Sequence, residues 1–578
     1  MAIANVARIF MFFIAGCSLL ASNLYAQNVE RYGLVIDEIF ADPTPSVGLP
    51  SAEYIEIKNT SGRSVNLLGC RLSSSTSKSG PFPSYTLPAD SFLVICSTGN
   101  SALFAPYGRV LGISSFPSLN NTGTTLSITS KENATIHAVS YSGSWFQNDV
   151  KSNGGWTLEM IDTKNPCNAL NNWKASVDTK GGTPGQKNSV DGNNPDKAAP
   201  VLVRATTLDS VTIVLTFNEP LDSAKAATAT NYRIGEGGSL PVKAVAIAPS
   251  FTTVKLSLSV PLKKSTIYIV TANDITDCSG NVINAMNTAR VGLASDIDPF
   301  DVVINEILFN PKPNANDYVE IYNRSNKIFS LKDLYVANRS SSNNTLGGLR
   351  QLTNETMLFF PGDYIVISDR SSVVKQNYVT QYPDNFIDVT MPSFPDDQGV
   401  VVILNAQGQV IDELKYSAKW HFALIDNEEG IALERIDYNK PTQSKDNWTS
   451  AASSVGFGTP TYQNSQFRSD LSIQGEMSIT PKTFSPDNDG FEDFTTINIR
   501  LADPNYVANI TIFDASGRPV KNLVKNATLS SNSTFRWDGL DDKLRKVAVG
   551  VYIIYTEVFN LSGKKNSFKN TVVVGAKF

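Results

Sequence analysis

The feature that most constrains the fold is a long internal repeat, in which several motifs return far downstream in unchanged order. The repeated segments are 34–43 (LVIDEIFADP) with 302–311 (VVINEILFNP), 53–59 with 317–323, 92–95 with 364–367, 158–162 with 433–437, Asn172-Trp173 with Asn447-Trp448, and the GTP and NS motifs of 182–189 with those of 458–465. Two copies of one domain, each of about 160 residues, account for these matches. We place the copies at residues 30–190 and 300–466.

Within each copy the apolar residues recur with a period of two. Ile55 and Ile57 fall on one face of an extended segment, and Tyr54, Glu56 and Lys58 fall on the other. This pattern predicts a strand that is buried on one face only. Clusters of Gly, Pro, Asn and Ser interrupt the runs at short intervals, and no stretch shows a sustained helical stripe. The chain is therefore predicted to be all-β, built from sandwiches or barrels.

Two further modules complete the chain. A turn-rich linker at 191–195 precedes alternating strand patterns at 211–217 and 255–258, in a module that we place at 199–294. After a second linker, the second repeat copy follows. The last module, at 472–578, has strand-like runs at 509–513, 551–558 and 571–574. A chain of 578 residues is long enough for several domains of this size.

The N-terminus has the pattern of a secretory signal peptide. Arg8 precedes the apolar run 9–15, and small residues lead to Ala26. We expect residues 1–26 to be removed after Ala26. The alternative is a lipobox at 14–17, which would make Cys17 a lipidated N-terminus. No later stretch has the roughly 20 apolar residues that a transmembrane helix requires, so we expect no transmembrane segment in the mature chain.

The motifs of the repeat resemble a known family. The I-(D/N)-E-I segments at Ile36 and Ile304, the Y-(I/V)-E-I segments at Tyr54 and Tyr318, and the closing N-W, G-T-P and N-S motifs are similar to those of the bacterial lamin-tail domain. That domain is an immunoglobulin-like (Ig-like) sandwich found in secreted proteins. The resemblance implies two lamin-tail domains in this chain.

The other two modules also resemble known domains. Segments 217–222 (FNEPLD) and 277–281 (DCSGN), with Asn231 and Tyr232, look like a bacterial Ig-like domain of the surface-layer type. The last module resembles the Ig-like terminal domain of flagellar hook-capping proteins and of exported Bacteroidota proteins, through motifs at 484–490, 512–518, 537–539 and 550–552. In such Bacteroidota proteins this domain often directs export by the type IX secretion pathway. Together the resemblances imply tandem immunoglobulin-like β-sandwich modules.

Chemistry-bearing motifs are scarce. The chain has two histidines, His137 and His421, and no HExxH, GxSxG or P-loop motif. We expect no enzymatic activity and no cofactor other than calcium. A net charge of −5 without a basic field argues against nucleic acid as a partner. Three glutamates recur in both copies, either as a shared ligand site or as structural hydrogen-bond acceptors: Glu38/Glu306, Glu56/Glu320 and Glu159/Glu434.

The best candidate site is an acidic turn in the last module. Asp487, Asp489, Glu492 and Asp493 surround a glycine, and such a set of hard oxygen donors suits Ca²⁺. The turn does not follow the EF-hand pattern. The alternative is a solvated turn without an ion, since Asp, Asn and Gly are common in turns.

Outside the leader, four cysteines remain. Cys70 and Cys96 lie in apolar, strand-like runs of one domain and are our candidates for a disulfide. The alternative is that both are buried thiols that act as small hydrophobic residues. Cys167 lies in a loop without an evident base, which gives little support for a reactive thiol.

These observations predict a secreted or cell-surface adhesion or scaffold protein that is not an enzyme. Its expected partners are an extracellular protein or a glycan, and the secretion machinery through the last module. The alternative is a carbohydrate-binding accessory protein of extracellular polysaccharide degradation, which exposed aromatic pairs on one sheet face would favour.

Overall fold

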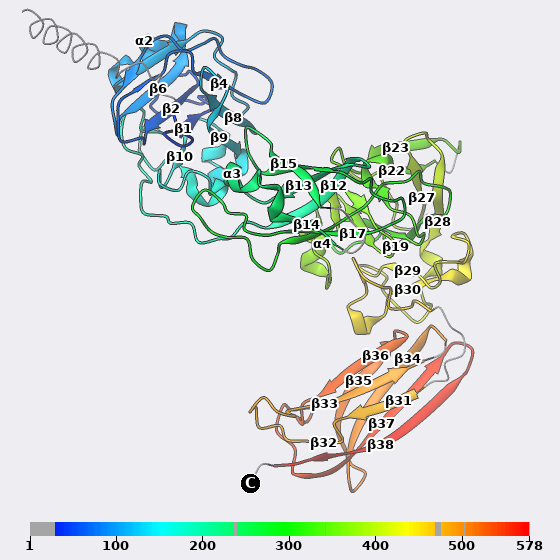
Figure 1. Ribbon diagram of the computed structural model, residues 1–578. Coiled ribbons are helices and arrows are strands. Elements are labelled where there is room, and N and C mark those ends of the chain that lie inside the picture. The colour runs from blue at the N-terminus through cyan, green and yellow to red at the C-terminus, as the bar shows by residue number, and fades with distance from the viewer. Residues whose placement is uncertain (1–28, 236–239, 341–342, 469–475, 502, 577–578) are drawn as a thin grey trace, which may run out of the picture. The chain divides into compact units, whose positions relative to one another are not determined.

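The computed structural model describes residues 29–235, 240–340, 343–468, 476–501 and 503–576 (Figure 1). The predicted signal peptide, with both Cys17 and Ala26, lies outside the described residues. The prediction of an all-β chain of tandem sandwich modules is confirmed. Among the described residues, no helix has the length and apolar character that would be needed to cross a membrane.

The first repeat module pairs a six-stranded sheet with a three-stranded one. Its elements are β1 (Leu34–Phe40), β2 (Tyr54–Asn59), β3 (Val65–Asn66), β4 (Arg71–Ser73), β5 (Thr86–Leu87), β6 (Phe92–Ser97), α2 (Ser101–Phe104), β7 (Val110–Ile113), β8 (Gly123–Thr129), β9 (Thr135–Ser142), β10 (Leu158–Met160) and β11 (Trp173–Ala175). The large sheet has the order β11-β10-β1-β2-β6-β7, the small one β4-β8-β9, and β3 pairs with β5. Leucine, isoleucine and valine side chains from both sheets form the core between them.

The second repeat module has the same strand order in its large sheet. Its elements are β19 (Val302–Leu308), β20 (Tyr318–Asn323), β21 (Phe329–Ser330), β22 (Leu334–Arg339), β23 (Leu346–Gln351), β24 (Leu358–Phe359), β25 (Tyr364–Ser368), α4 (Ser371–Asn377), β26 (Phe386–Asp388), β27 (Gln398–Asn405), β28 (Val410–Ser417), β29 (Leu433–Arg435) and β30 (Trp448–Ser450). The order β30-β29-β19-β20-β25-β26 corresponds strand by strand to that of the first module, and β23-β22-β27-β28 forms the opposite sheet.

The large sheet of each repeat module is covered on both faces. Ile55 and Ile57 of β2 enter the core between the sheets, as the alternation predicts. Tyr54 on the other face packs into a second apolar cluster, and Glu56 beside it is also completely buried. The expectation that this strand is buried on one face only is therefore wrong. The closing segment 182–190 covers the second face, and its contacts with the sheet are described below.

The module between the repeats is a smaller sandwich. Its elements are β12 (Leu202–Asp209), β13 (Thr212–Phe217), α3 (Ser223–Ala226), β14 (Tyr232–Ile234), β15 (Pro241–Ala246), β16 (Thr253–Leu258), β17 (Tyr268–Ala272) and β18 (Thr288–Val291). One sheet has the order β12-β13-β16-β15 and the other β14-β17-β18. Alternate residues of β13 and β16 are buried, which is why their sequences alternate.

The last module is also a two-sheet sandwich. Its elements are β31 (Glu476–Thr480), β32 (Thr483–Phe484), β33 (Thr495–Arg500), β34 (Tyr506–Asp514), β35 (Pro519–Thr528), β36 (Asn532–Trp537), β37 (Gly550–Asn560) and β38 (Lys565–Val574). The sheets have the orders β31-β33-β36 and β32-β38-β37-β34-β35, and the buried Trp537 lies in the core between them.

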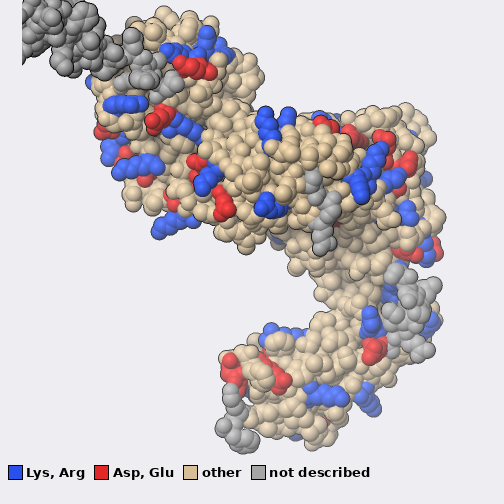
Figure 2. All heavy atoms as spheres, in the orientation of Figure 1, with Lys and Arg blue, Asp and Glu red and all other residues tan. Residues whose placement is uncertain are grey.

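Charged side chains of both signs are interspersed on the surface. On the face that Figure 2 shows, lysines and arginines lie among aspartates and glutamates, and no large area carries one sign. This distribution agrees with the small net charge of −5.

Candidate functional site

Three glutamates stand side by side across the large sheet of the first repeat module. Glu38 of β1 has Glu56 of β2 and Glu159 of β10 as its neighbours in register. All three are 0% exposed. Ile36 and Ile39 both point into the core, because a bulge shifts the register between Ile36 and Glu38. The glutamate row therefore lies on the opposite face of the sheet.

The row binds the closing segment 182–190. Glu38 accepts a hydrogen bond of 2.8 Å from the N–H of Thr183. Glu159 accepts hydrogen bonds from the hydroxyls of Thr183, at 2.9 Å, and Ser189, at 2.7 Å. Thr183 belongs to the GTP motif and Ser189 to the NS motif, so the two closing motifs of the repeat are the partners of its recurrent glutamates.

The second repeat module has the same arrangement. Glu306 accepts a hydrogen bond of 3.0 Å from the N–H of Thr459. The hydroxyl of Thr459 lies 2.8 Å from Glu306 and 2.9 Å from Glu434 and bridges the two carboxyls, with its one proton donated to one of them. Glu434 also accepts a hydrogen bond of 2.8 Å from the hydroxyl of Ser465. Glu320 completes the row and accepts a hydrogen bond from the N–H of Thr461. Protein groups thus bind both rows, which favours the structural interpretation of the recurrent glutamates.

Burial changes the protonation of these rows. Loss of hydration, followed by the charge of neighbouring Glu159, raises the pKa of Glu38 to about 8. Burial and the charge of Glu434 likewise raise the pKa of Glu306 to about 8. A carboxyl with such a pKa holds its proton at neutral pH, so adjacent members of the row can lie together without repulsion.

Both histidines have hydrogen-bond partners within the protein. His137 accepts a hydrogen bond of 2.9 Å at Nδ1 from the N–H of Ile36, and Nδ1 of His421 lies 2.8 Å from the hydroxyl of Ser450. Burial lowers the pKa of each histidine to about 4. Each ring is buried in its own module, and neither has the position of a solvent-accessible general base.

The acidic turn brings together three of its four predicted ligands. One oxygen from each of Asp487, Asp489 and Asp493 lies within 4.8 Å of the others, and Glu492 is not part of this group. The turn also binds its own amides, since Asp493 accepts hydrogen bonds from the N–H groups of Asn488 and, at 2.9 Å, of Gly490. Calcium binding at this exposed turn stays a prediction.

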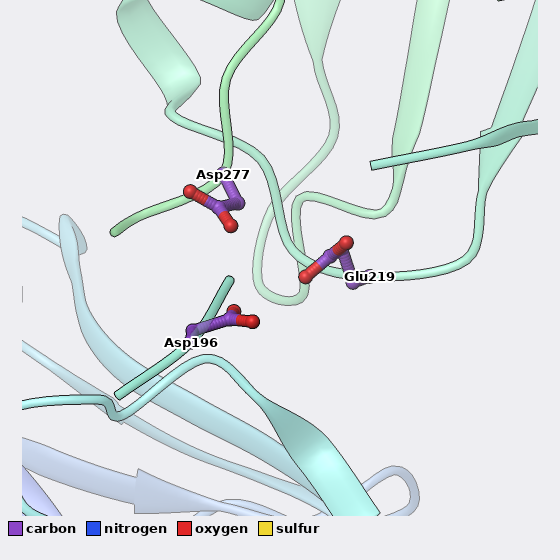
Figure 3. A group of neighbouring side chains, drawn as sticks. All are labelled: Asp196, Glu219 and Asp277. Atoms are coloured by element: carbon purple, nitrogen blue, oxygen red, sulfur yellow. The ribbon is translucent and has the colours of Figure 1, made fainter. Parts of the chain in front are cut away.

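A second group of carboxylates was not anticipated from the sequence. Asp196, Glu219 and Asp277 meet in the first half of the chain, with one oxygen of each within 4.8 Å of the others (Figure 3). They come from distant segments, so no local spacing indicates the group. Glu219 and Asp277 do stand in the FNEPLD and DCSGN motifs of the Ig-like resemblance.

The predicted disulfide between Cys70 and Cys96 is wrong, because both are free thiols. Cys70 lies in the core between the two sheets. Cys96 of β6 belongs to the apolar cluster on the other face of the large sheet. Burial raises the pKa of each thiol to about 11. Both act as small buried hydrophobic residues, the alternative that the sequence left open.

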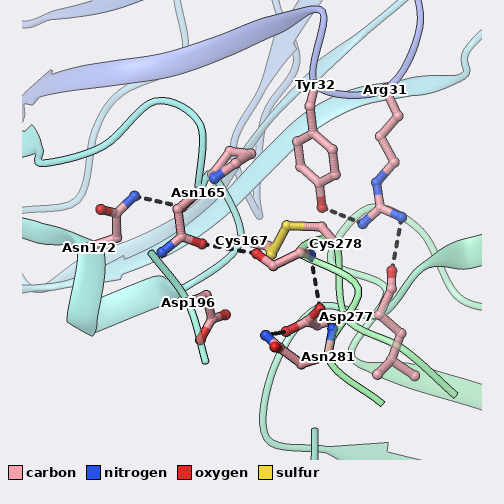
Figure 4. The surroundings of a disulfide bond; sticks show 12 residues. Arg31, Tyr32, Asn165, Cys167, Asn172, Asp196, Asp277, Cys278 and Asn281 are labelled. Atoms are coloured by element: carbon pink, nitrogen blue, oxygen red, sulfur yellow. Dashed lines mark hydrogen bonds between the residues drawn. A yellow bond between two sulfur atoms is a disulfide. The ribbon is translucent and has the colours of Figure 1, made fainter. Parts of the chain in front are cut away.

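The structure instead joins Cys167 to Cys278 (Figure 4). The two residues are 111 positions apart, one in the first repeat module and one in the module that follows it. Both stand in loops with turn-forming neighbours, in Pro-Cys-Asn and Asp-Cys-Ser sequences. This loop setting is the signal that distinguishes them from Cys70 and Cys96, which lie in apolar runs.

Comparisons with known families agree with this architecture. Residues 30–143 and 298–418 match the model of the Lamin Tail Domain, and residues 189–292 match that of a bacterial Ig-like domain. The chain carries two lamin-tail domains and one bacterial Ig-like domain. These matches confirm the resemblances to the lamin-tail domain and to a bacterial Ig-like domain, whereas the resemblance of the last module to an export domain stays a prediction. No curated protein is similar enough to match the chain.

Several solved structures match parts of the chain. The N-terminal part of the bacterial S-layer protein SbsC is 17% identical over 29% of this chain and 40% of that one, with a TM-score of 0.16. A DUF4876 family protein from Bacteroides thetaiotaomicron is 12% identical over 33% of this chain and 78% of that one, with a TM-score of 0.17. PorZ, a surface component of the type IX secretion system of Porphyromonas gingivalis, is 10% identical over 91% of this chain and 74% of that one, with a TM-score of 0.16.

The chain spans 40% to 55% of the length of the three SbsC structures that it matches. At TM-scores of this size, none of the likenesses supports a conclusion about function.

Proposed function

We propose that the protein is a non-enzymatic, secreted or cell-surface scaffold or adhesion protein. The observation that carries this proposal is the disulfide between Cys167 and Cys278, which joins the first lamin-tail domain to the Ig-like domain. Disulfides form and persist in oxidising compartments outside the cytoplasm and are rare inside it. A chain with this bond is therefore expected to reach its folded state after export.

The module architecture supports a role in binding or assembly. Loops on rigid sandwiches commonly carry recognition, and the tandem modules offer many of them to an extracellular protein or glycan. His137 and His421 are both buried and bonded to protein groups. The interspersed surface charge in Figure 2 supports a partner other than nucleic acid. We propose no catalytic residue and no cofactor other than calcium.

The last module is proposed to direct export by the type IX pathway. Its closing residues 569–574 lie in β38, which pairs along its length with β37. To test this role, the protein is tagged internally and expressed in the producing cells at full length and truncated before Leu471. Intact cells are then treated with protease.

If only the full-length protein is shaved from the cells or released, the last module is an export signal and the surface assignment holds. If both forms are protected within the envelope, the sorting role is refuted and a periplasmic scaffold is the better description. A chain that stays reduced in the cytoplasm would refute the extracellular assignment itself.

Carbohydrate binding is the second candidate function. In the second lamin-tail domain the rings of Tyr322, Tyr364, Tyr438 and Phe467 form one cluster, with centroids 4.1 Å apart between Tyr322 and Tyr438. Tyr322 and Tyr364 are half-buried, so part of the cluster faces solvent. A glycan screen of the wild-type protein and Tyr364→Ala tests this role, since a sugar that stacks on the cluster must bind the variant more weakly.

A further inference from the structure

Three carboxylates from separate segments meet where the first lamin-tail domain joins the Ig-like domain. Asp196 lies in the connection before β12, Glu219 follows β13, and Asp277 follows β17. Figure 3 shows the three carboxylates turned toward a common point, and one oxygen of each lies within 4.8 Å of the others. Such convergence of carboxylates is stabilised by a bound cation or by protonation.

The group lacks protein partners for some of its oxygens. Oδ2 of Asp196 and Oε1 of Glu219 are buried and have no hydrogen-bond partner. Glu219 is 6% exposed, and its carboxylate is turned toward the other two (Figure 3). In the described part of the chain, no lysine or arginine forms an ion pair with any of the three.

Asp277 is held in place by the turn that follows it. This residue is 1% exposed, and its Oδ1 accepts hydrogen bonds of 2.9 Å from the N–H groups of Ser279 and Asn281. Its Oδ2 accepts a hydrogen bond of 2.7 Å from Nδ2 of Asn281. The carboxylate is therefore oriented before any ligand binds, which lowers the entropic cost of binding.

The chemistry of the group identifies its ligand. All of its donors are carboxylate oxygens, which hard divalent cations prefer, and it offers no imidazole or thiolate. Oxygens that bind one Ca²⁺ at about 2.4 Å must lie within about 5 Å of one another, and the three oxygens meet this condition because all lie within 4.8 Å of one another. We propose that Asp196, Glu219 and Asp277 bind one Ca²⁺ ion, with water and backbone carbonyls completing its coordination.

The disulfide lies directly beside this group (Figure 4). Cys278 follows Asp277 in the chain and is bonded to Cys167 of the lamin-tail domain. The hydroxyl of Ser279 donates a hydrogen bond of 3.3 Å to Asn165 of the same domain. The ion would thus join the connection that contains Asp196 to the loop that the disulfide anchors. Calcium and the disulfide would together stiffen the junction of the two domains.

The test is isothermal titration calorimetry of Ca²⁺ into the mature, disulfide-bonded full chain at neutral pH. The wild-type protein is expected to bind Ca²⁺. Glu219→Gln and Asp196→Asn should each weaken the affinity about tenfold or more. The matched control is Asp489→Asn in the acidic turn, which should keep the affinity of the junction site.

Several results would overturn the assignment. These are the absence of calcium binding by the wild-type chain, unchanged affinity in both junction variants, or loss of all binding in Asp489→Asn. Asp196 is half-buried in a connection, so its substitution should leave the fold intact even if Glu219→Gln does not. In the presence of a chelator, the unfolding temperatures of the two junction variants should match that of the wild-type protein. A Ca²⁺-induced rise in unfolding temperature that persists in Asp196→Asn would also count against the site.

Discussion

The glutamate rows make a quantitative prediction about pH. The carboxyl of Glu306 has a pKa of about 8 in the folded protein and 4.5 as its ordinary value. Between these values the folded state holds a proton that the unfolded chain has released. The stabilisation is therefore complete below the unfolded pKa and is lost as the pH rises through the folded one.

The size of the effect follows from linkage. One additional proton in the folded state changes the free energy of unfolding by about 1.4 kcal/mol per pH unit. Raising the pH from about 5.5 to about 7.5 should therefore remove about 3 kcal/mol through Glu306 alone. Because glutamine resembles a protonated glutamate and does not titrate, Glu306→Gln should lack this part of the pH dependence.

The assay is urea unfolding of the full chain at several pH values, followed by pulse proteolysis so that cleavage within the second lamin-tail domain reports its own stability. The stability difference between wild type and Glu306→Gln isolates the group, because the other glutamates titrate in both proteins. Wild-type stability that rises over this pH range, or a difference that does not depend on pH, would refute the assignment of a proton to the row.

Three further predictions concern stability and disulfide pairing. Non-reducing peptide mapping should find Cys167 linked to Cys278, and a Cys70 to Cys96 link would contradict the structure. Cys278→Ser should lower the free energy of unfolding by roughly 4–5 kcal/mol, because the unfolded chain is no longer restrained by the closed loop. Thr459→Val should cost about 1–3 kcal/mol, because it leaves buried carboxyl oxygens without their hydroxyl partner. Urea unfolding checks this cost against the exposed Thr345→Val, and equal effects would refute the role of the hydroxyl. Arg435→Met should lower the free energy of unfolding by roughly 3–5 kcal/mol, because Asp412 is left unpaired. Adding Asp412→His to this variant should recover most of the lost stability. A double variant no more stable than Arg435→Met would refute this pairing.

Some features could be predicted from the sequence because they depend on local pattern. Alternation identified Ile55 and Ile57 as core residues, and the order of repeated motifs identified the two equivalent domains. Burial of Glu56 could not be predicted in this way. Alternation shows which residues share a face, but it does not show that a segment far along the chain covers that face.

The predicted pairing of Cys70 with Cys96 was wrong for a related reason. Cys70 and Cys96 lie in one domain, but the two faces of the large sheet separate them. The true partners lie in successive domains, and their approach depends on how those domains meet. The carboxylate group of Asp196, Glu219 and Asp277 has the same origin, because only the folded junction assembles it.

The two lamin-tail domains show which interactions this fold requires. In β1 and in its equivalent β19, one backbone N–H near the start of the strand needs a buried acceptor. In the first domain His137 accepts from Ile36 at 2.9 Å, and in the second Asp412 accepts from Ile304 at 2.8 Å. Arg435 supplies the positive charge beside this carboxylate, 3.2 Å from Asp412.

The first domain has Met160 at the position of Arg435. An uncharged side chain is sufficient there, because the neighbouring His137 is neutral and needs no positive charge beside it. A position that needs only an acceptor can therefore change its chemistry, provided that its neighbour changes with it. The glutamate rows are identical in both copies. Each member accepts hydrogen bonds from the closing segment and also lies beside the other glutamates of its row, so a change at one position affects both sets of contacts. The rows and the closing motifs are thus a part of the repeat that keeps the same residues and the same hydrogen bonds in both copies.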